Sequence, residues 1–193
     1  MQINAVLEAA CEVQTLLVSQ SAEFCFIGGL AIQRWGEPRF TNDADISLLT
    51  RFVHDEKWTD YLLAHFTARN ADAREFALAR RVLLLQAGNG VGIDISLGGL
   101  DFEIRSVGRA SPWKLPNGAE ITTCSAEDLV VHKAFASRDR DWLDVDGILM
   151  RQGTRLDVKL IFEELTPLVA LKEEPEILSR LRSMMVKRGV ANC

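Results

Sequence analysis

The 193-residue chain contains 48% hydrophobic and 25% charged residues, proportions typical of a soluble globular protein. They exclude a disordered chain, a collagen-like fibre and a small scaffold held by disulfides. The 22 lysines and arginines against 27 aspartates and glutamates give a net charge of −5. This charge excludes a general polyanion binder, because nonspecific nucleic-acid affinity needs an excess of cations. The four cysteines have no CxxC spacing and predict no zinc site.

The sequence predicts a cytoplasmic protein with no membrane contact. Residues 1–14 lack the basic start and apolar core of a secretory signal. No apolar run approaches the roughly 18 residues that a membrane-spanning helix needs.

Predicted helices and strands alternate through the first part of the chain. Apolar residues at helical spacing predict an amphipathic helix over 3–18. A short apolar strand over 24–27 ends at a glycine pair, and a short helix follows over 30–35. Alternating polar and apolar residues over 43–48 predict a strand with one exposed face. Aromatic and leucine residues predict a helix over 54–67.

Two hairpins are predicted next. Residues 80–87 and 91–97 flank the sequence Gly-Asn-Gly, which favours a tight turn between two strands. A weaker turn signal, Pro-Asn-Gly, lies at 116–118.

The remaining residues are predicted to be helical. Ser125 begins a capping-box pattern, and the helix is expected to run to about Met150. A last helix is expected between Pro175 and Gly189. We therefore predict an α+β fold, with a mixed sheet and flanking helices over 1–124 and a helical C-terminal lobe over 125–193, the two lobes packing together or forming one compact domain.

Two short motifs on neighbouring elements indicate a nucleotide site. Side chains two apart on a strand share a face, so Asp43 and Asp45 are expected to point the same way. Two adjacent carboxylates repel unless a proton or a cation relieves the repulsion, and Mg²⁺ binds through carboxylates and substrate phosphates. The Gly28-Gly29 turn allows backbone N–H groups to approach a phosphate. Together they predict a nucleoside triphosphate with a metal ion at its phosphates.

A third carboxylate would complete a two-metal site or activate an attacking hydroxyl. Asp94 is the best candidate, because it lies between β-branched residues on a predicted strand. Asp101 and Glu103 would also share a face if they lay on a strand. Asp101, however, follows a second glycine pair and is expected at a turn.

The helix predicted from Ser125 brings several charged residues onto one stripe. At about 100° per residue, four polar side chains fall within about 80° of Lys133, and Arg138 points away. Lys133 is therefore predicted to contact the triphosphate, with an aspartate orienting it. The four side chains are Ser137, Arg140, Asp141 and Asp144.

The order of these motifs resembles the nucleotidyltransferase superfamily, whose pattern is an apolar strand with a diglycine, then D-x-D, then a lone carboxylate. Residues 129–133 and 138–144 are similar to the K…R-x-R-D-x-x-D helix of its AbiEii/AbiGii toxin branch.

The resemblance covers most of residues 24–150 and implies a polymerase-β-like fold, Mg²⁺ or Mn²⁺, and transfer of a nucleotidyl group from an NTP to a hydroxyl with release of pyrophosphate. It implies catalytic and metal-binding roles for Asp43, Asp45 and Asp94, and nucleotide-binding roles for Gly28, Gly29, Lys133 and Asp141.

The acceptor stays open at this level. The toxin branch implies RNA, such as a tRNA end, or a protein hydroxyl, and a cognate antitoxin as partner. The arginines at 69, 74, 80 and 81 favour RNA, whereas the acidic net charge opposes it. A small-molecule acceptor such as an aminoglycoside, or a nucleotide-binding module without turnover, is the alternative.

Each motif also has an ordinary structural reading. A diglycine serves many tight turns, and Asp43, Asp45 and Asp94 would also suit strand faces exposed to water. The charged residues between 133 and 144 would also form surface ion pairs along a helix.

Overall fold

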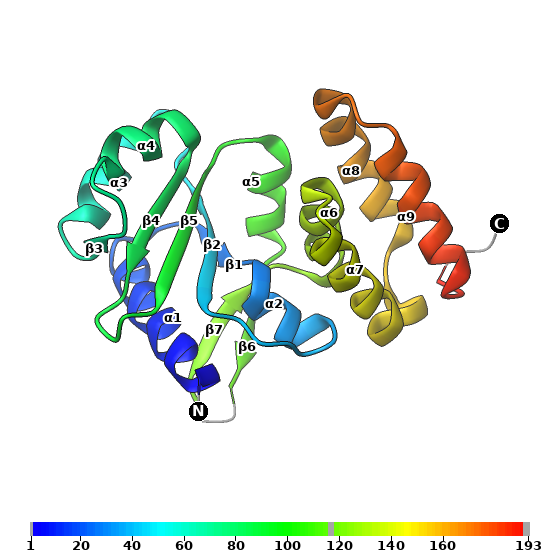
Figure 1. The fold of residues 1–193 in the computed structure, drawn as a ribbon, viewed down its shortest axis with the longest axis horizontal. Coiled ribbons are helices and arrows are strands. Elements are labelled where there is room, and N and C mark those ends of the chain that lie inside the picture. Colours follow the sequence, from blue (N-terminus) through cyan, green and yellow to red (C-terminus); the bar gives the residue numbers. More distant parts are fainter. Residues whose placement is uncertain (1, 116–117, 191–193) are drawn as a thin grey trace. The chain divides into compact units, whose positions relative to one another are not determined.

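The computed structural model describes residues 2–115 and 118–190 (Figure 1). The chain forms two compact units, the first of residues 1–30 and 40–124 and the second of residues 31–39 and 125–193. The sequence placed all of 1–124 in one lobe, whereas the structure assigns 31–39 to the helical unit.

The first unit contains most of the strands and helices. These are α1 (Gln2–Ser19), β1 (Phe24–Phe26), β2 (Asp43–Leu49), α3 (Asp55–Leu63), β3 (Thr67–Ala68), α4 (Ala73–Arg80), β4 (Val82–Gln86), β5 (Gly92–Gly98), α5 (Asp101–Gly108), β6 (Ser111–Lys114) and β7 (Glu120–Thr123).

Helix α2 (Gly28–Trp35) begins in the first unit and ends in the second. The second unit continues with α6 (Ala126–Ala136), α7 (Asp139–Gln152), a short 3-10 helix η1 (Gly153–Arg155), α8 (Val158–Lys172) and α9 (Glu176–Lys187).

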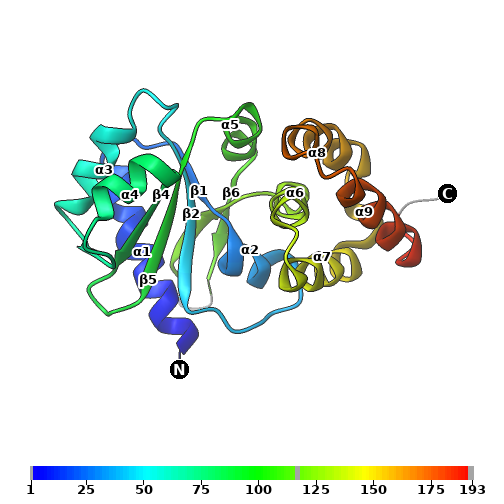
Figure 2. The ribbon, with the colours of Figure 1, turned by 45° about the horizontal axis from the view of Figure 1, so that its top comes forward.

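A mixed seven-stranded sheet forms the centre of the first unit, in the order β3-β4-β5-β2-β1-β7-β6. The pairs β2–β5 and β1–β7 are parallel, and the other neighbouring strands are antiparallel. Helices α1, α3 and α4 cover one face of this sheet, and α5 lies on the other side (Figures 1 and 2). The predicted α+β class and mixed sheet are confirmed.

The period-two pattern of β2 and β5 decides which side chains enter the core. Ala44 and Ile46 on β2 and Ile93 and Ile95 on β5 are fully buried and belong to one hydrophobic cluster with α1, α3 and α4. Because successive side chains of a strand point to opposite faces, the aspartates that alternate with them lie on the other face of the sheet. Burial of this apolar face therefore positions the acidic residues.

Several predicted elements are confirmed with shifted ends, and two helices escaped prediction. Helix α2 begins at Gly28, so the glycine pair forms its first turn. Residues 73–80 and 101–108 form α4 and α5, which the sequence did not predict. Strands β6 and β7 pair antiparallel as expected, while residues 116–117 of their predicted turn lie outside the described residues.

The prediction of a single helix from Ser125 to Met150 is wrong, because the helix is interrupted between α6 and α7. Ser137 takes a left-handed conformation with φ of +59°, and Arg138 is extended. The Arg138 N–H donates to the Asp141 carboxylate at 3.3 Å, which caps the new helix and satisfies a backbone donor at its start. The cap at Ser125 is confirmed: its hydroxyl accepts the Asp128 N–H at 3.1 Å.

Within the parts of the chain that the structure describes, no helix combines the length and apolar character needed to cross a membrane.

Candidate active site

The glycine pair packs directly against the side chains of β2 and the loop before it. Gly28 has a φ of +55°, and a Cβ placed on it would lie 1.9 Å from Asp45 Oδ2. A Cβ on Gly29 would lie 2.2 Å from the Thr41 hydroxyl oxygen. The Gly29 N–H donates to Asp45 Oδ2 at 3.2 Å. Only residues without a side chain allow this approach, so the diglycine fixes the position of the Asp45 carboxylate.

Three carboxylates share the open face of β2 and β5. In the parallel register Asp45 lies opposite Asp94, and Asp43 lies opposite Gly92. Asp43 and Asp45 alternate with buried Ala44 and so share one face, as predicted. The structure therefore brings together the diglycine and all three aspartates that the sequence selected.

The electrostatics of Asp94 reflect this crowding. Burial raises the pKa of Asp94, the guanidinium of Arg69 acts to lower it, and the nearby Asp43 carboxylate raises it again. The net shift is upward. A carboxylate whose pKa is raised by burial and by a neighbouring carboxylate favours a proton or a cation beside it.

Arg69 supplies a cation at this face. It follows the short strand β3 and forms an ion pair with the Asp94 carboxylate. Its guanidinium passes over Gly92, where an added Cβ would lie 2.8 Å from Nη1. Gly92 thus leaves room for the arginine between Asp43 and Asp94.

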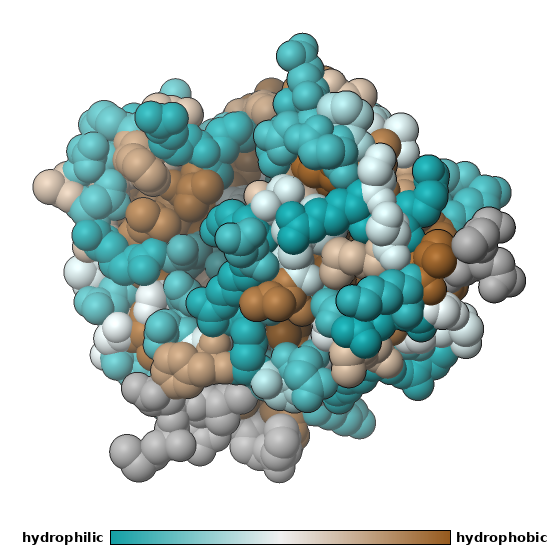
Figure 3. All heavy atoms as spheres, turned by 45° about the vertical axis from the view of Figure 1, so that its right-hand side comes forward, coloured by the Kyte–Doolittle hydropathy of each residue, from teal (hydrophilic) through white to brown (hydrophobic). Residues whose placement is uncertain are grey.

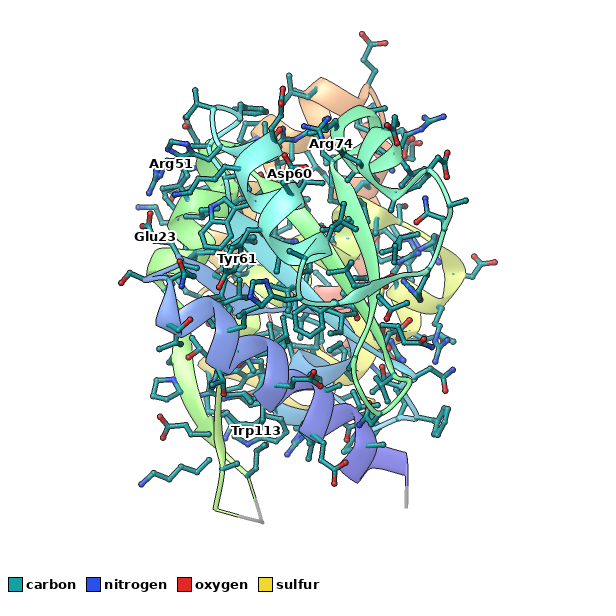
Figure 4. The ribbon with its side chains drawn as sticks, turned by 90° about the vertical axis from the view of Figure 1, so that its left-hand side faces the viewer. Glu23, Arg51, Asp60, Tyr61, Arg74 and Trp113 are labelled. Carbon is teal, nitrogen blue, oxygen red and sulfur yellow. The ribbon has the colours of Figure 1, made fainter. Side chains whose placement is uncertain are left out.

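Two other arginines of the predicted basic run, Arg74 and Arg81, bind carboxylates away from Asp94. Arg74 lies beside Asp60 (Figure 4) and donates to it at 2.7 Å. It also donates to Glu56 at 3.0 Å. Arg81 pairs with Asp55. These arginines are partnered by carboxylates of α3, so the run does not form one cationic surface beside Asp94.

Asp101 and Glu103 are not a strand pair. They lie in the first turn of α5, where the Glu103 carboxylate accepts the N–H groups of Gly99 at 2.7 Å and Leu100 at 2.8 Å. Glu103 therefore caps a helix, and the expectation that Asp101 sits near a turn is close to its actual place at a helix start.

The second unit contains a buried network around Lys133. The Lys133 ammonium contacts Asp141 at 3.0 Å and Asp144 at 2.8 Å. Arg39 binds the Asp144 carboxylate through two nitrogens, at 2.6 and 2.8 Å. Arg138 binds Asp141 at 2.6 Å, so the prediction that Arg138 points away from this group is wrong.

Both aspartates of this network are held ionised. Burial alone would raise the pKa of Asp141, but hydrogen bonds from Arg138 and Lys133 outweigh it and the pKa is lowered. Burial acts on Asp144 in the same way and is outweighed by hydrogen bonds from Arg39 and Lys133. Two ionised carboxylates therefore fix the Lys133 ammonium in place, as the sequence anticipated, although they reach it across a helix break.

Comparison with known families decides the assignment. A family model described as nucleotidyl transferase AbiEii toxin, type IV TA system, matches residues 15–169. The chain belongs to the AbiEii family. The match extends over both units and includes the diglycine, the three aspartates and Lys133.

One solved structure agrees with a nucleotidyltransferase fold for this AbiEii member. The solution structure of the antibiotic-resistance factor ANT(2'')-Ia superposes with a TM-score of 0.54 at 12% identity, covering 93% of this chain and 99% of that one. This likeness shows the fold alone.

A second solved structure is an antigenic nucleotidyltransferase-like protein from Paracoccidioides brasiliensis. It covers 91% of both chains at 17% identity, with a TM-score of 0.49 that is too low to argue from. No curated protein matches the sequence.

The donor chemistry of the AbiEii site fits a hard divalent ion. Among residues 2–115 and 118–190, no three acidic, histidine or cysteine side chains converge into a ready metal cage. Mg²⁺ needs only one or two protein carboxylates, with water and substrate phosphates as further ligands. Asp43 and Asp45 offer that pair, while Arg69 engages Asp94.

Two arginines of these sites were missed by sequence reasoning. Arg69 was expected only in a general basic run, and Arg39 was not singled out. Arg39 and Asp144 are 105 residues apart, and Arg69 reaches Asp94 only because β3 and β5 both pair with β4. No local spacing in the sequence predicts either ion pair, Arg39 with Asp144 or Arg69 with Asp94.

Proposed function

We propose that this AbiEii chain transfers a nucleotidyl group from an NTP to a hydroxyl of RNA and releases pyrophosphate. The observation that carries the proposal is the placement of Asp43, Asp45 and Asp94 on one face of two adjacent strands, against the backbone of Gly28 and Gly29. The family assignment supports the same chemistry.

Asp43 and Asp45 would hold Mg²⁺, which supplies positive charge to the polyphosphate. The phosphates would approach the backbone at the start of α2, where Gly28 and Gly29 pack against Asp45 and Thr41. In the reaction the acceptor hydroxyl oxygen forms a bond to the α-phosphorus, and the bond from the α-phosphorus to the bridging oxygen breaks. Asp94, opposite Asp45, would take the hydroxyl proton or complete the metal site.

Lys133 and Asp141 are proposed to serve the nucleotide from the second unit. Lys133 is only 8% exposed and lies between two ionised aspartates. Such a fixed ammonium carries little orientational freedom, which suits it to a phosphate oxygen in a defined position. The family description, a type IV toxin–antitoxin system, supports a cognate antitoxin as partner.

A labelling experiment tests the proposed reaction and its acceptor. The protein is incubated with Mg²⁺, each of the four NTPs labelled on the α-phosphate, and total cellular RNA and protein. We expect label in the RNA fraction and release of one pyrophosphate for each nucleotide transferred. Label in protein alone would refute the RNA acceptor, and absence of both label and pyrophosphate would refute the reaction.

Replacing Arg69 is expected to strengthen metal binding. In the Arg69→Gln variant the acidic face loses its own cation, so a divalent ion no longer competes with the guanidinium. We expect a several-fold higher affinity for Mn²⁺, measured by the loss of the free-ion signal in electron paramagnetic resonance. Arg74→Gln is the matched control, because Arg74 pairs with Asp60 and Glu56. Equal Mn²⁺ affinity in both variants would contradict this role.

A further inference from the structure

Strand β4 is apolar on both of its faces, although only one of them belongs to the core. Residues 82–85 are four apolar residues in succession. Leu83 and Leu85 are fully buried in one hydrophobic cluster with α1, α3 and α4. Val82 and Leu84 point to the other face and are only half-buried. A strand with apolar side chains on both faces is usually covered on both, so this second face of β4 is suited to bind an apolar group.

The strand register places this face of β4 beside the proposed catalytic carboxylates. Leu84 lies opposite Asp94 on β5, and Asp94 lies opposite Asp45 on β2. Residues directly opposite each other on neighbouring strands share a face, so these three side chains form one row across the sheet. Arg69 continues the row, because its N–H donates to the Leu84 carbonyl at 3.0 Å and its guanidinium binds Asp94. An apolar side chain and a cation therefore border Asp94 on the side away from Asp45.

The Arg69 guanidinium uses only part of its hydrogen-bonding capacity. A guanidinium carries five N–H donors. Within the described parts of the chain, that of Arg69 donates one hydrogen bond, from Nη2 to Asp94 Oδ1. The side chain is 32% exposed, so its remaining donors are accessible to a ligand. Arg69 can therefore bind a phosphate oxygen while it keeps its bond to Asp94.

The geometry of the proposed transfer favours an acceptor on this side of Asp94. In an in-line displacement the attacking and leaving oxygens lie on opposite sides of the phosphorus. The pyrophosphate would leave beside Gly28 and Gly29, which follow β1. In the sheet order β4-β5-β2-β1, strand β4 lies at the opposite end of this group of strands. At about 4.8 Å between strands, Leu84 is roughly 10 Å from Asp45, a distance that one nucleoside can span.

We propose that Val82, Leu84 and Arg69 bind the terminal nucleotide of the RNA acceptor. The base lies against Val82 and Leu84, and Arg69 binds the phosphate. A nucleotide suits a surface of both kinds because every base has a face that can pack on side chains and its phosphate is an anion. Figure 3 shows such a mixed surface at its upper left, where hydrophobic side chains are bordered by hydrophilic ones. A polycationic aminoglycoside would be repelled by Arg69. The inference rests on the proposed function.

Leu84→Thr is expected to raise the KM for total cellular tRNA about 10-fold, because the smaller side chain buries less apolar surface against the base. Threonine suits a strand, and the KM for NTP and the affinity for Mn²⁺ should not change. Transfer of labelled nucleotide at increasing tRNA concentration measures the effect. Leu63→Thr is the matched control, because Leu63 is a half-buried leucine of α3 on the other side of the sheet. It should leave the KM for tRNA unchanged.

Arg69→Gln is expected to raise the KM for tRNA about 10-fold at saturating Mn²⁺. The dependence of this KM on salt concentration should weaken by about 1 in logarithmic slope, since one phosphate contact is lost. Arg69→Lys keeps the charge and should retain the wild-type slope. A purely structural ion pair with Asp94 would leave the salt slope unchanged in both variants, which would contradict the phosphate contact.

Photo-cross-linking tests the inference without any substitution in the protein. A tRNA transcript that ends in 4-thiouridine is irradiated with the wild-type protein, and mass spectrometry locates the attached residue. We expect attachment within residues 82–86. An unchanged KM for tRNA in folded Leu84→Thr protein, or cross-links confined to other segments, would overturn the acceptor site on β4 and leave the proposed function intact. If the wild-type protein labels no RNA, the RNA acceptor itself fails, and with it this inference.

Discussion

The Asp45→Asn variant is expected to fold normally and to transfer nucleotide on the order of 1,000-fold more slowly or worse, in line with the loss of a preorganised charged group in an active site. Asparagine has the same shape, and its amide oxygen can still accept the Gly29 N–H that Asp45 accepts at 3.2 Å. The substitution removes one negative charge from the proposed metal site. Pyrophosphate release under saturating NTP and Mg²⁺ measures the effect, and circular dichroism reports the fold.

Asp101→Asn is the matched control for this variant. It removes an equal charge from an exposed position at the start of α5, and we expect transfer close to that of the wild type. Near-wild-type transfer by folded Asp45→Asn protein would show that Asp45 holds no metal ion.

Gly28→Ala should inactivate the protein through the position of Asp45. The new Cβ would lie 1.9 Å from Asp45 Oδ2, so either the carboxylate or the start of α2 must move. A misplacement of about 1 Å at a catalytic group can cost on the order of 100-fold in rate. The left-handed φ of +55° adds about 1 kcal/mol of backbone strain. Steady-state pyrophosphate release measures the loss.

Gly90→Ala separates the collision from the backbone strain. Gly90 also has a positive φ, +85°, but no atom lies within 4 Å of a Cβ built on it. We expect a comparable loss of thermal stability with activity retained. If Gly28→Ala were as active as Gly90→Ala, the close packing of the diglycine on Asp45 would have no catalytic importance.

The parts of the fold that the sequence predicted are those with a local periodic pattern. Strand β2 alternates apolar and polar residues, and this alternation predicted both the strand and the shared face of Asp43 and Asp45. Strand β5 was predicted from the Gly-Asn-Gly turn before it, and its parallel register with β2 places Asp94 on the same face. Helices α4 and α5 span eight residues each. Over so short a length the apolar pattern does not distinguish a helix from a loop or a strand.

The helix break at Ser137 shows a different limit. The stretch from Ser125 to Met150 contains no glycine before Gly147 and no proline, so helical propensity alone predicts one helix. Side-chain contacts outweigh that propensity. The Asp141 carboxylate accepts the Arg138 N–H at the start of α7 and also binds Lys133 in one buried network. The sequence correctly predicted that Lys133 lies beside Asp141 and Asp144. It did so from one continuous helix, which the structure shows to be two.

The cations around the carboxylates depend on long-range contacts. Arg69 reaches Asp94 through the pairing of β3, β4 and β5, and Arg39 reaches Asp144 from a loop far away in the sequence. Sequence spacing identified the acidic groups because their neighbours are local. It did not identify their counter-ions because those are set by the fold.

Crystals grown with Mn²⁺ and a non-hydrolysable NTP test the central claim most directly, through the anomalous scattering of the manganese. We predict a manganese peak bonded to carboxylate oxygens of Asp43 and Asp45, with the triphosphate beside Gly28 and Gly29. A manganese peak or a triphosphate bound elsewhere, with Asp43 and Asp45 contacting neither, would contradict the account.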